Sequence, residues 1–315
     1  MKPSCSSAFL VLYFGPLPEY FKYWAKTCEP NHETCHFFVY TDQVKSRCRY
    51  NRAVTIIPYT FDQLCRDAAA RFDIHIPAKN TRIACDCRLL LFGLRCSKEN
   101  LDKYDFVGYT DLDVIYGKIC DFLPCDPKSF SMISAHNDRP CGPFTLYRKS
   151  VLTDICTDRQ IKAFFESSRA ELFYETRLFT DCRSKFMPMS GNSAKDRIAK
   201  SICFSHLDES DLLIKIAMKH GPVCCRAHPL QPTMAGKISH RKPLALWDRG
   251  RLSVRDALGR QAEGAVFHFS RFKNRSRFRI SQDALKSDRF GVYKYGITGV
   301  NSGLARLRLY VSMLY

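Results

Sequence analysis

Two aspartates, Asp111 and Asp113, have the residue type and spacing that best suit chemistry in this chain. They close an apolar, β-prone run, and side chains at positions i and i+2 of a strand point to the same face. Core-like residues flank both carboxylates, and charges in such surroundings are costly unless they are paired or bound to metal. Carboxylate oxygens suit a hard divalent cation that also holds phosphate oxygens. The spacing therefore predicts a metal site, although Asp-x-Asp triplets also occur by chance in solvated turns.

The composition predicts a globular protein with anionic partners. The chain has 315 residues, of which 45% are hydrophobic and 13% aromatic, enough for one large domain or two ordinary ones. Its 49 basic and 31 acidic residues give a net charge of +18. Such an excess suits nucleic acid, anionic lipid or phosphorylated substrates, without choosing among them. No internal repeat is visible, which argues against a solenoid.

The sixteen cysteines are scattered, without a CxxC pair or a Cys/His set at zinc spacing. The apolar run at 8–14 is short for a signal peptide and lacks a cleavage site. No stretch approaches the roughly 20 apolar residues of a spanning helix. We therefore expect free thiols in a reducing, cytoplasmic setting.

The first half of the chain alternates strand and helix patterns. Strands are predicted at 8–14, 36–41, 54–58 and 106–112, and helices at 19–28, 60–72 and 82–96. This alternation predicts an α/β fold with a mostly parallel sheet and crossover helices. Ligands of such sheets bind at the carboxyl ends of strands, where Asp42, Asp111 and Asp113 fall.

The second half is less regular. Strands are expected at 130–135 and 143–148, strand pairing at 264–280, helices at 150–181 and 208–219, and a long loop at 226–246. The tail at 303–315 has a basic amphipathic pattern that suits peripheral contact with an anionic membrane, or simply a last helix packed on the domain.

Several segments share a residue order with a known family. They are Tyr13-Phe14-Gly15, Leu17–Phe21, Trp24, Cys28, Thr41-Asp42, Cys85–Arg88, Gly108–Asp113, Gly117, Gly142–Arg148, Asp208-Glu209 and Phe267–Phe269. In this order they resemble the GT-A glycosyltransferases, most closely a bacterial-type family associated with capsular and surface polysaccharide synthesis. The similarity covers roughly residues 8–273 and is most specific in the first third. The chain departs from that family at Arg88-Leu89, where Lys-Pro is usual, and it lacks an aromatic-Lys pair before Asp86.

The resemblance implies a GT-A fold, with a Rossmann-like central sheet flanked by helices and a smaller acceptor-side region. Residues 1–280 would form one domain, with a nucleotide-sugar-binding half at 1–125 and an acceptor-side half at 126–280, and 281–315 would be a tail. The resemblance also implies a sugar nucleotide donor, which we expect to be a UDP-sugar, Mn²⁺ or Mg²⁺, and a glycan or glycolipid acceptor.

The family pattern also implies roles for individual residues. His268 resembles the late histidine that often completes the metal site beside Asp111 and Asp113; otherwise it is a histidine at the core edge. Asp111 would also contact the donor. Arg271 and Lys273, in an alternating basic row at 271–279, would grip the diphosphate or form a solvated or polyanion-binding face.

The remaining donor contacts compete with structural roles. Tyr13 and Phe14 would lie against the base and ribose, and Asp42 would accept from their N–H or hydroxyl groups; the aromatic pair equally suits the core. Asp86 and Arg88 would lie near the donor, or form an internal salt bridge with a third residue.

The candidate catalytic base of an inverting transferase is Asp208 or Glu209. Acids in a first helical turn are also favoured by the helix dipole alone. Two further functions stay open: a basic nucleic-acid or polyanion-binding protein, against which no recognised nucleic-acid motif appears, and a degenerate GT-A domain that binds donor without turnover.

Overall fold

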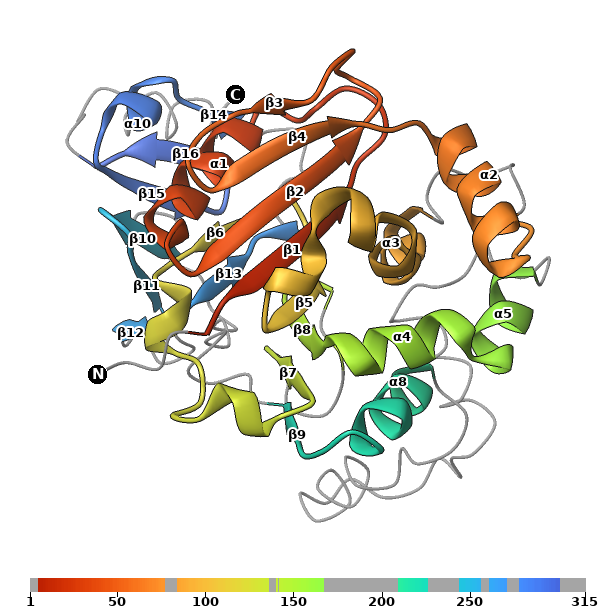
Figure 1. The fold of residues 1–315 in the computed structure, drawn as a ribbon. Coiled ribbons are helices and arrows are strands. Elements are labelled where there is room, and N and C mark those ends of the chain that lie inside the picture. Colours follow the sequence, from red (N-terminus) through yellow and green to blue (C-terminus); the bar gives the residue numbers. More distant parts are fainter. Residues whose placement is uncertain are drawn as a thin grey trace, which may run out of the picture.

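The computed structural model describes residues 5–76, 84–135, 140, 142–166, 209–225, 244–255, 261–270 and 278–300. An eight-stranded sheet runs through its centre in the order β3-β4-β2-β1-β5-β8-β7-β9 (Figure 1). Four neighbouring strands are parallel: β4 (Val54–Pro58), β2 (Cys35–Thr41), β1 (Ser7–Leu12) and β5 (Phe106–Tyr109). The protein is therefore a mixed α/β fold, as the strand and helix pattern predicted.

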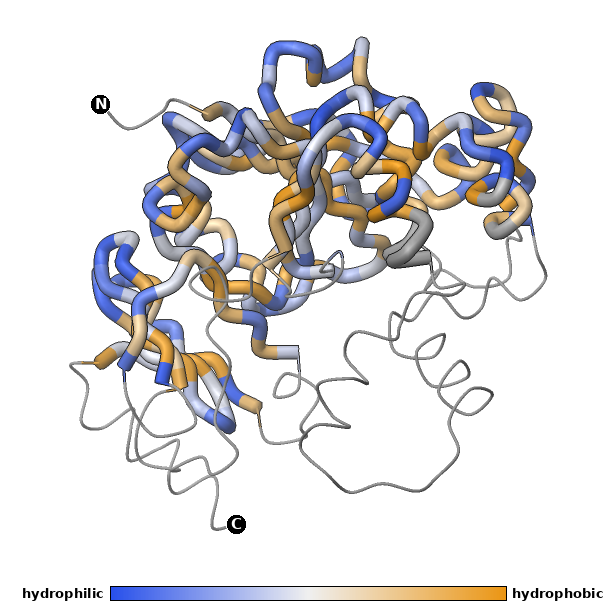
Figure 2. The backbone as a smooth tube through the Cα atoms, turned by 90° about the horizontal axis from the view of Figure 1, so that it is seen from below, coloured by the Kyte–Doolittle hydropathy of each residue, from blue (hydrophilic) through white to orange (hydrophobic). Residues whose placement is uncertain are grey.

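Both faces of the parallel strands are buried, which is why these segments read as continuous apolar runs. Leu10 and Phe38 face one hydrophobic core, while Phe9 and Phe37 alternate with them and face a second core. Phe9 and Phe37 stack with their ring centroids 5.0 Å apart. Hydrophobic stretches accordingly gather in the interior of the molecule, and hydrophilic ones at its periphery (Figure 2).

Helices cover the two faces of this sheet. On one face α2 (Phe61–Phe72) and α3 (Ala84–Glu99) contribute to the first core, with α4 (Lys149–Thr157), α5 (Arg159–Glu166) and α8 (Glu209–Met218). On the other face α1 (Phe21–Cys28) contributes Trp24 to the second core. A capping box between Thr60 and Gln63 begins α2 and satisfies N–H groups at its start.

The remaining strands of the central sheet include antiparallel pairs. They are β3 (Cys48–Arg49), β7 (Met132–Ser134), β8 (Thr145–Arg148) and β9 (Val223–Cys225). The backbone of β8 passes close to Gly108 of β5, where an added Cβ would lie 1.9 Å from the Thr145 carbonyl oxygen. Glycine is therefore required at 108 for β5 and β8 to pair at this register.

A second, six-stranded sheet has the order β12-β11-β10-β15-β16-β14. Its strands are β10 (Ala245–Asp248), β11 (Arg251–Arg255), β12 (Gln261–Glu263), β14 (Arg279–Ile280), β15 (Arg289–Tyr293) and β16 (Gly296–Gly299). Residues 281–300, part of the segment that the sequence analysis assigned to a tail, thus supply α10 (Asp283–Lys286) and two paired strands. Phe290 and Val292 are buried in this part of the chain, so hydrophobic burial explains the difference.

Other predicted elements differ in extent. The strand predicted at 106–112 ends at Tyr109, so the aspartate pair lies in the turn that follows. The helix predicted at 150–181 is two helices, α4 and α5, up to Glu166, and its remainder lies outside the described residues. The loop predicted at 226–246 ends in β10, and the segment at 303–315 is not described.

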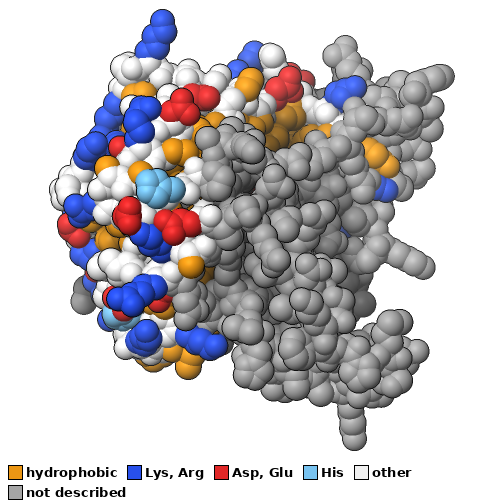
Figure 3. All heavy atoms as spheres, turned by 90° about the vertical axis from the view of Figure 1, so that its right-hand side faces the viewer, with side chains coloured by type: hydrophobic (Ala, Val, Ile, Leu, Met, Phe, Trp, Pro, Cys, Tyr) orange, Lys and Arg blue, Asp and Glu red, His pale blue; other side chains and the backbone are white. Residues whose placement is uncertain are grey.

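The state of the cysteines and the distribution of surface charge can be compared with what the composition predicted. None of the twelve cysteines whose side chains the structure describes forms a disulfide. Lys and Arg side chains are spread among Asp and Glu over the described part of the face in Figure 3. Within the described ranges, no helix has the length and apolar character needed to cross a membrane.

Candidate metal centre

A short pair of strands brings the candidate metal ligands together. β6 (Val114–Tyr116) follows Asp113 directly and pairs antiparallel with β13 (Val266–His268), with His268 opposite Val114. The backbone N–H of Phe269 donates to the Asp113 carbonyl at 3.0 Å and continues this pairing. The register of two strands far apart in sequence therefore places His268 beside the aspartates.

Asp111, Asp113 and His268 form a compact cluster. One ligand atom from each residue lies within 4.8 Å of the others. His268 Nε2 is 3.2 Å from an Asp113 oxygen and 3.9 Å from an Asp111 oxygen. The Asp113 side chain is 4% exposed, whereas those of Asp111 and His268 are 29% and 23% exposed. The cluster thus joins one buried carboxylate to two ligands that reach the surface.

Arg88 orients the first aspartate from helix α3. Its Nη1 donates to Asp111 Oδ1 at 2.7 Å and to the Gly142 carbonyl at 3.2 Å, and its guanidinium lies 4.2 Å from the centroid of the Tyr109 ring. The predicted internal salt bridge of Arg88 therefore exists, and its partner is a candidate metal ligand. A planar guanidinium suits both the carboxylate and the ring face.

Buried hydroxyls fix the turn that carries the aspartates. The Tyr116 hydroxyl hydrogen-bonds that of Thr110, which donates to the Pro143 carbonyl at 2.8 Å. Burial, with smaller contributions from Cys28 and Asp111, raises the pKa of Tyr116 well above its ordinary value. The phenol therefore stays protonated and can donate. This arrangement anchors the residue before Asp111.

Three further residues that the sequence analysis did not single out hold the other edge of β6. The Thr27 hydroxyl accepts from the Tyr116 N–H at 3.2 Å, and Trp247 Nε1 donates to the Tyr116 carbonyl at 3.0 Å. Asn31, in the 3₁₀ helix η1 (Glu29–Asn31), donates to the Gly117 carbonyl at 3.0 Å. In the sequence, a lone polar side chain such as Thr27 or Asn31 does not by itself identify its hydrogen-bond partner.

Residues expected to contact the donor lie at the ends of β1 and β2. Asp42 follows β2, is exposed, and accepts from the Gly15 N–H at 2.9 Å and from the Gln43 amide at 2.7 Å, both through Oδ1. Tyr13 and Phe14 follow β1 and are half-buried against different cores, and Phe14 makes an edge contact with Phe61 at 5.8 Å. Asp42 therefore tethers the turn after β1, and the aromatic pair contributes to packing.

Five predicted site residues have no described side chain. Asp86 lies in α3 and Glu209 begins α8, but only their backbone is described. Asp208, Arg271 and Lys273 lie outside the described residues.

The donor set fits a divalent cation. Two carboxylates and an imidazole offer oxygen and nitrogen ligands of the kind that Mn²⁺ takes, and the carboxylates alone also suit Mg²⁺. Asp113 is a nearly buried carboxylate, and a bound cation would compensate its charge. Three protein ligands would fill only part of the coordination shell of such a cation, so phosphate oxygens could complete it.

The sequence model of a family of unknown function (DUF6625) matches residues 9–300, which include the whole cluster and both sheets except the first two residues of β1. A search of curated proteins finds no match.

Proposed function

The chain belongs to the DUF6625 family of unknown function, and we propose that it is a metal-dependent glycosyltransferase with a GT-A type fold. It would transfer a sugar from a nucleotide diphosphate sugar, with UDP as the first nucleotide to test, to a polysaccharide or glycolipid acceptor. The convergence of Asp111, Asp113 and His268 carries this proposal.

The place of the cluster in the sheet supports a nucleotide ligand. From β1 the chain adds β2 and β4 on one side and then β5 on the other, so the strand order reverses between β1 and β5. Ligands of open α/β sheets bind outside the carboxyl ends of strands at such a reversal. Tyr13 follows one of these two strands, and Asp111 follows the other closely.

Under this proposal, the residues in and around the cluster would have separate roles. Asp111, Asp113 and His268 would hold Mn²⁺ or Mg²⁺, which when bound supplies positive charge for the diphosphate leaving group. Arg88 orients Asp111 through the 2.7 Å ion pair. Asp42 uses Oδ1 for the Gly15 N–H, and its Oδ2 has no hydrogen-bond partner among the described residues, so it can accept from a ribose hydroxyl.

The proposal also includes a catalytic base, further diphosphate contacts and a cellular location. Asp208 or Glu209 remains the candidate base, and Arg271 and Lys273 remain candidate diphosphate contacts. Twelve described cysteines outside disulfides suit a reducing cytoplasmic compartment, and the net charge of +18 suits peripheral contact with an anionic membrane surface.

A thermal-shift screen of nucleotide sugars, with and without Mn²⁺, tests the proposal. The correct donor should raise the Tm of the wild type only with metal, because a ligand that binds the folded state stabilises it by mass action. Asp113→Asn should abolish this metal-dependent shift. The matched control is Asp126→Asn, at an exposed aspartate away from the cluster, which should keep it.

The outcomes separate the alternative functions. A metal-dependent shift together with release of nucleoside diphosphate in the presence of an acceptor supports a transferase. A shift without turnover for any acceptor identifies a donor-binding domain that is not catalytic. If no nucleotide sugar binds, and heparin or RNA binds wild type and Asp113→Asn equally, the proposal is wrong and polyanion binding replaces it.

A further inference from the structure

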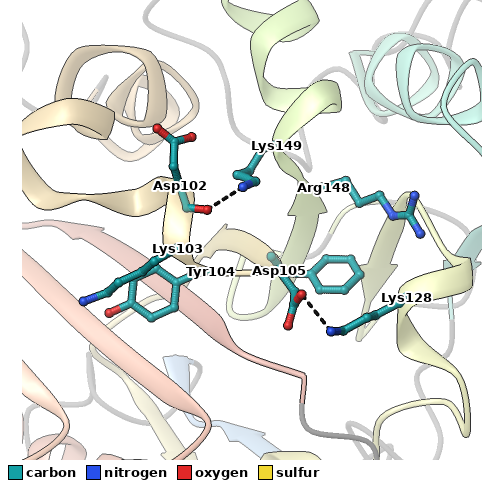
Figure 4. Close-up of a pocket in the computed structure, with 8 residues that line it drawn as sticks. Asp102, Lys103, Tyr104, Asp105, Lys128, Arg148 and Lys149 are labelled. Carbon is teal, nitrogen blue, oxygen red and sulfur yellow. Dashed lines mark hydrogen bonds and ion pairs between the residues drawn. The ribbon is translucent and has the colours of Figure 1, made fainter.

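A polar cavity lies at the beginning of β5, whereas the metal cluster lies beyond the end of that strand. The cavity has a volume of about 270 Å³ (Figure 4). Besides Tyr104 and Phe106, its lining consists of charged residues: Asp102, Lys103, Asp105, Lys128, Arg148 and Lys149. The four residues of β5 separate it from the turn of Asp111, about 13 Å at about 3.3 Å per strand residue. The cavity is therefore distinct from the candidate metal centre.

Positive charge exceeds negative charge in this cavity. Four of the lining residues are basic and two are acidic, and one acid is already occupied. Asp105 pairs with Lys128 at 2.9 Å and accepts from the backbone N–H of Ser6 at 2.9 Å and from its hydroxyl at 3.1 Å. The acidic oxygens of Asp105 are thus engaged by protein donors and compete little with a bound anion.

Two cations of the cavity have no acidic partner among the described residues. Lys149 donates to the backbone carbonyl of Asp102, not to a carboxylate. The Arg148 guanidinium forms no ion pair with any described residue, and Figure 4 shows it extending on the same side as Lys128. Half-buried cations without counter-ions favour the binding of an anion.

The start of helix α4 adds to this field. The helix begins at Lys149, in the wall of the cavity, and has nine residues. No side chain caps its first turn and no acidic residue lies there. Its unpaired N–H groups and the positive end of its dipole therefore reinforce the four cations.

We propose that this cavity binds a phosphate group, carried either by a soluble phosphorylated molecule or by the head group of an anionic lipid. Phosphate offers three or more acceptor oxygens, enough to bond arginine, lysine and backbone donors together, whereas a carboxylate offers two. Arg148 supplies the planar donor pair and Lys149 a point charge. Lys103 and Lys128 widen the positive wall.

Calorimetric titration with inorganic phosphate and pyrophosphate, in EDTA to exclude the metal centre, tests this site. Arg148→Gln/Lys149→Gln should weaken binding at least about tenfold, because each charge-assisted hydrogen bond is worth roughly 1.5–3 kcal/mol. The control Lys45→Gln/Arg66→Gln removes the same charge from exposed positions and should bind like wild type. Equal binding by both variants, equal loss in both, or no binding by wild type would overturn the proposal.

Vesicles separate the two sources of phosphate. Sedimentation with phosphatidic acid in phosphatidylcholine, against phosphatidylcholine alone, should be lost in the cavity variant if a lipid is the ligand. Binding of free phosphate without sedimentation assigns a soluble ligand.

A measurement on the wild type covers the case in which the double variant does not fold. Pyrophosphate should protect Lys103, Lys128 and Lys149 from amine acetylation, read by mass spectrometry, and leave Lys22 and Lys45 unprotected. Uniform labelling of all five lysines would contradict the site.

Discussion

The His268 imidazole lies 3.2 Å from the carboxylate of Asp113, a residue 155 positions earlier in the chain. The pairing of β13 with β6 produces this contact, since His268 is opposite Val114 in the ladder. A shift of one residue in that register would turn the imidazole to the other face of the strand. The two strands therefore act as the frame of the candidate metal centre.

His268→Ala should weaken Mn²⁺ binding at least about tenfold, because even residues that only support a metal ligand typically change affinity by about 10- to 100-fold. Calorimetric titration of Mn²⁺ without nucleotide measures the effect. His75→Ala, at a histidine whose side chain is 75% exposed, is the matched control and should leave the affinity unchanged. Equal Mn²⁺ affinity in wild type and His268→Ala would remove His268 from the site.

Arg88→Lys should lower metal-dependent affinity for the nucleotide sugar by about tenfold with little change in Tm. Lysine keeps the charge but loses the planar geometry that joins the Asp111 carboxylate, the Gly142 carbonyl and the Tyr109 ring. Titration of the donor at saturating Mn²⁺ measures it, with Arg66→Lys on the exposed side of α2 as control. An unchanged affinity would mean that Asp111 keeps its orientation without Arg88.

Local patterns predicted the parallel half of the fold well. The strand at Val54–Pro58 and the helix that ends at Phe72 were predicted at their observed positions, because alternation and helical periodicity are encoded within each segment. The spacing of Asp111 and Asp113 likewise marked the site without knowledge of a partner.

Contacts between segments far apart in the sequence could not be predicted from local patterns. β13 lies within the strand pairing predicted at 264–280, but its partner β6 has only three residues, and their pairing depends on tertiary contacts that local patterns do not encode. The second sheet was missed because its strands are two to five residues long, and because the pairing of β10 with β15 joins segments far apart in the sequence. The partner of Arg88 could not be inferred, because nothing local joins helix α3 to the turn after β5.

A buried acid in α3 should be essential for stability. The Glu99 side chain is 1% exposed and binds Arg47 at 2.6 Å and Arg95 at 2.8 Å. Glu99→Ala should lower the free energy of unfolding by about 3 kcal/mol, because it leaves Arg95 largely buried without its counter-ion. Urea denaturation measures this value.

The control for this prediction is an exposed ion pair. Glu29 and Arg52 lie 3.4 Å apart, with side chains 40% and 67% exposed. Glu29→Ala should cost less than about 1 kcal/mol, as exposed pairs usually do. Similar losses in both variants would show that the burial of Glu99 has no special effect.

The stability of the protein should fall at mildly acid pH because of His36 on β2. Burial is the main cause that lowers the pKa of His36 from 6.5 to about 4, and the positive charges of Lys103, Arg49 and Arg47 contribute. In the folded chain the neutral imidazole hydrogen-bonds Thr55 at 2.8 Å. Between pH 6.5 and about 4 the unfolded chain binds a proton at His36 that the folded chain does not.

Stability from this residue is therefore complete above pH 6.5 and is lost as the pH falls toward 4. His36→Gln keeps a hydrogen-bonding side chain but cannot titrate, so its Tm should fall less than that of wild type between pH 7 and pH 5. The difference should be a few degrees, since about 1 kcal/mol corresponds to at least about 2 °C for a chain of this size. His75→Gln, at an exposed histidine, should follow wild type, and parallel Tm curves for wild type and His36→Gln would show that His36 titrates normally in the folded protein.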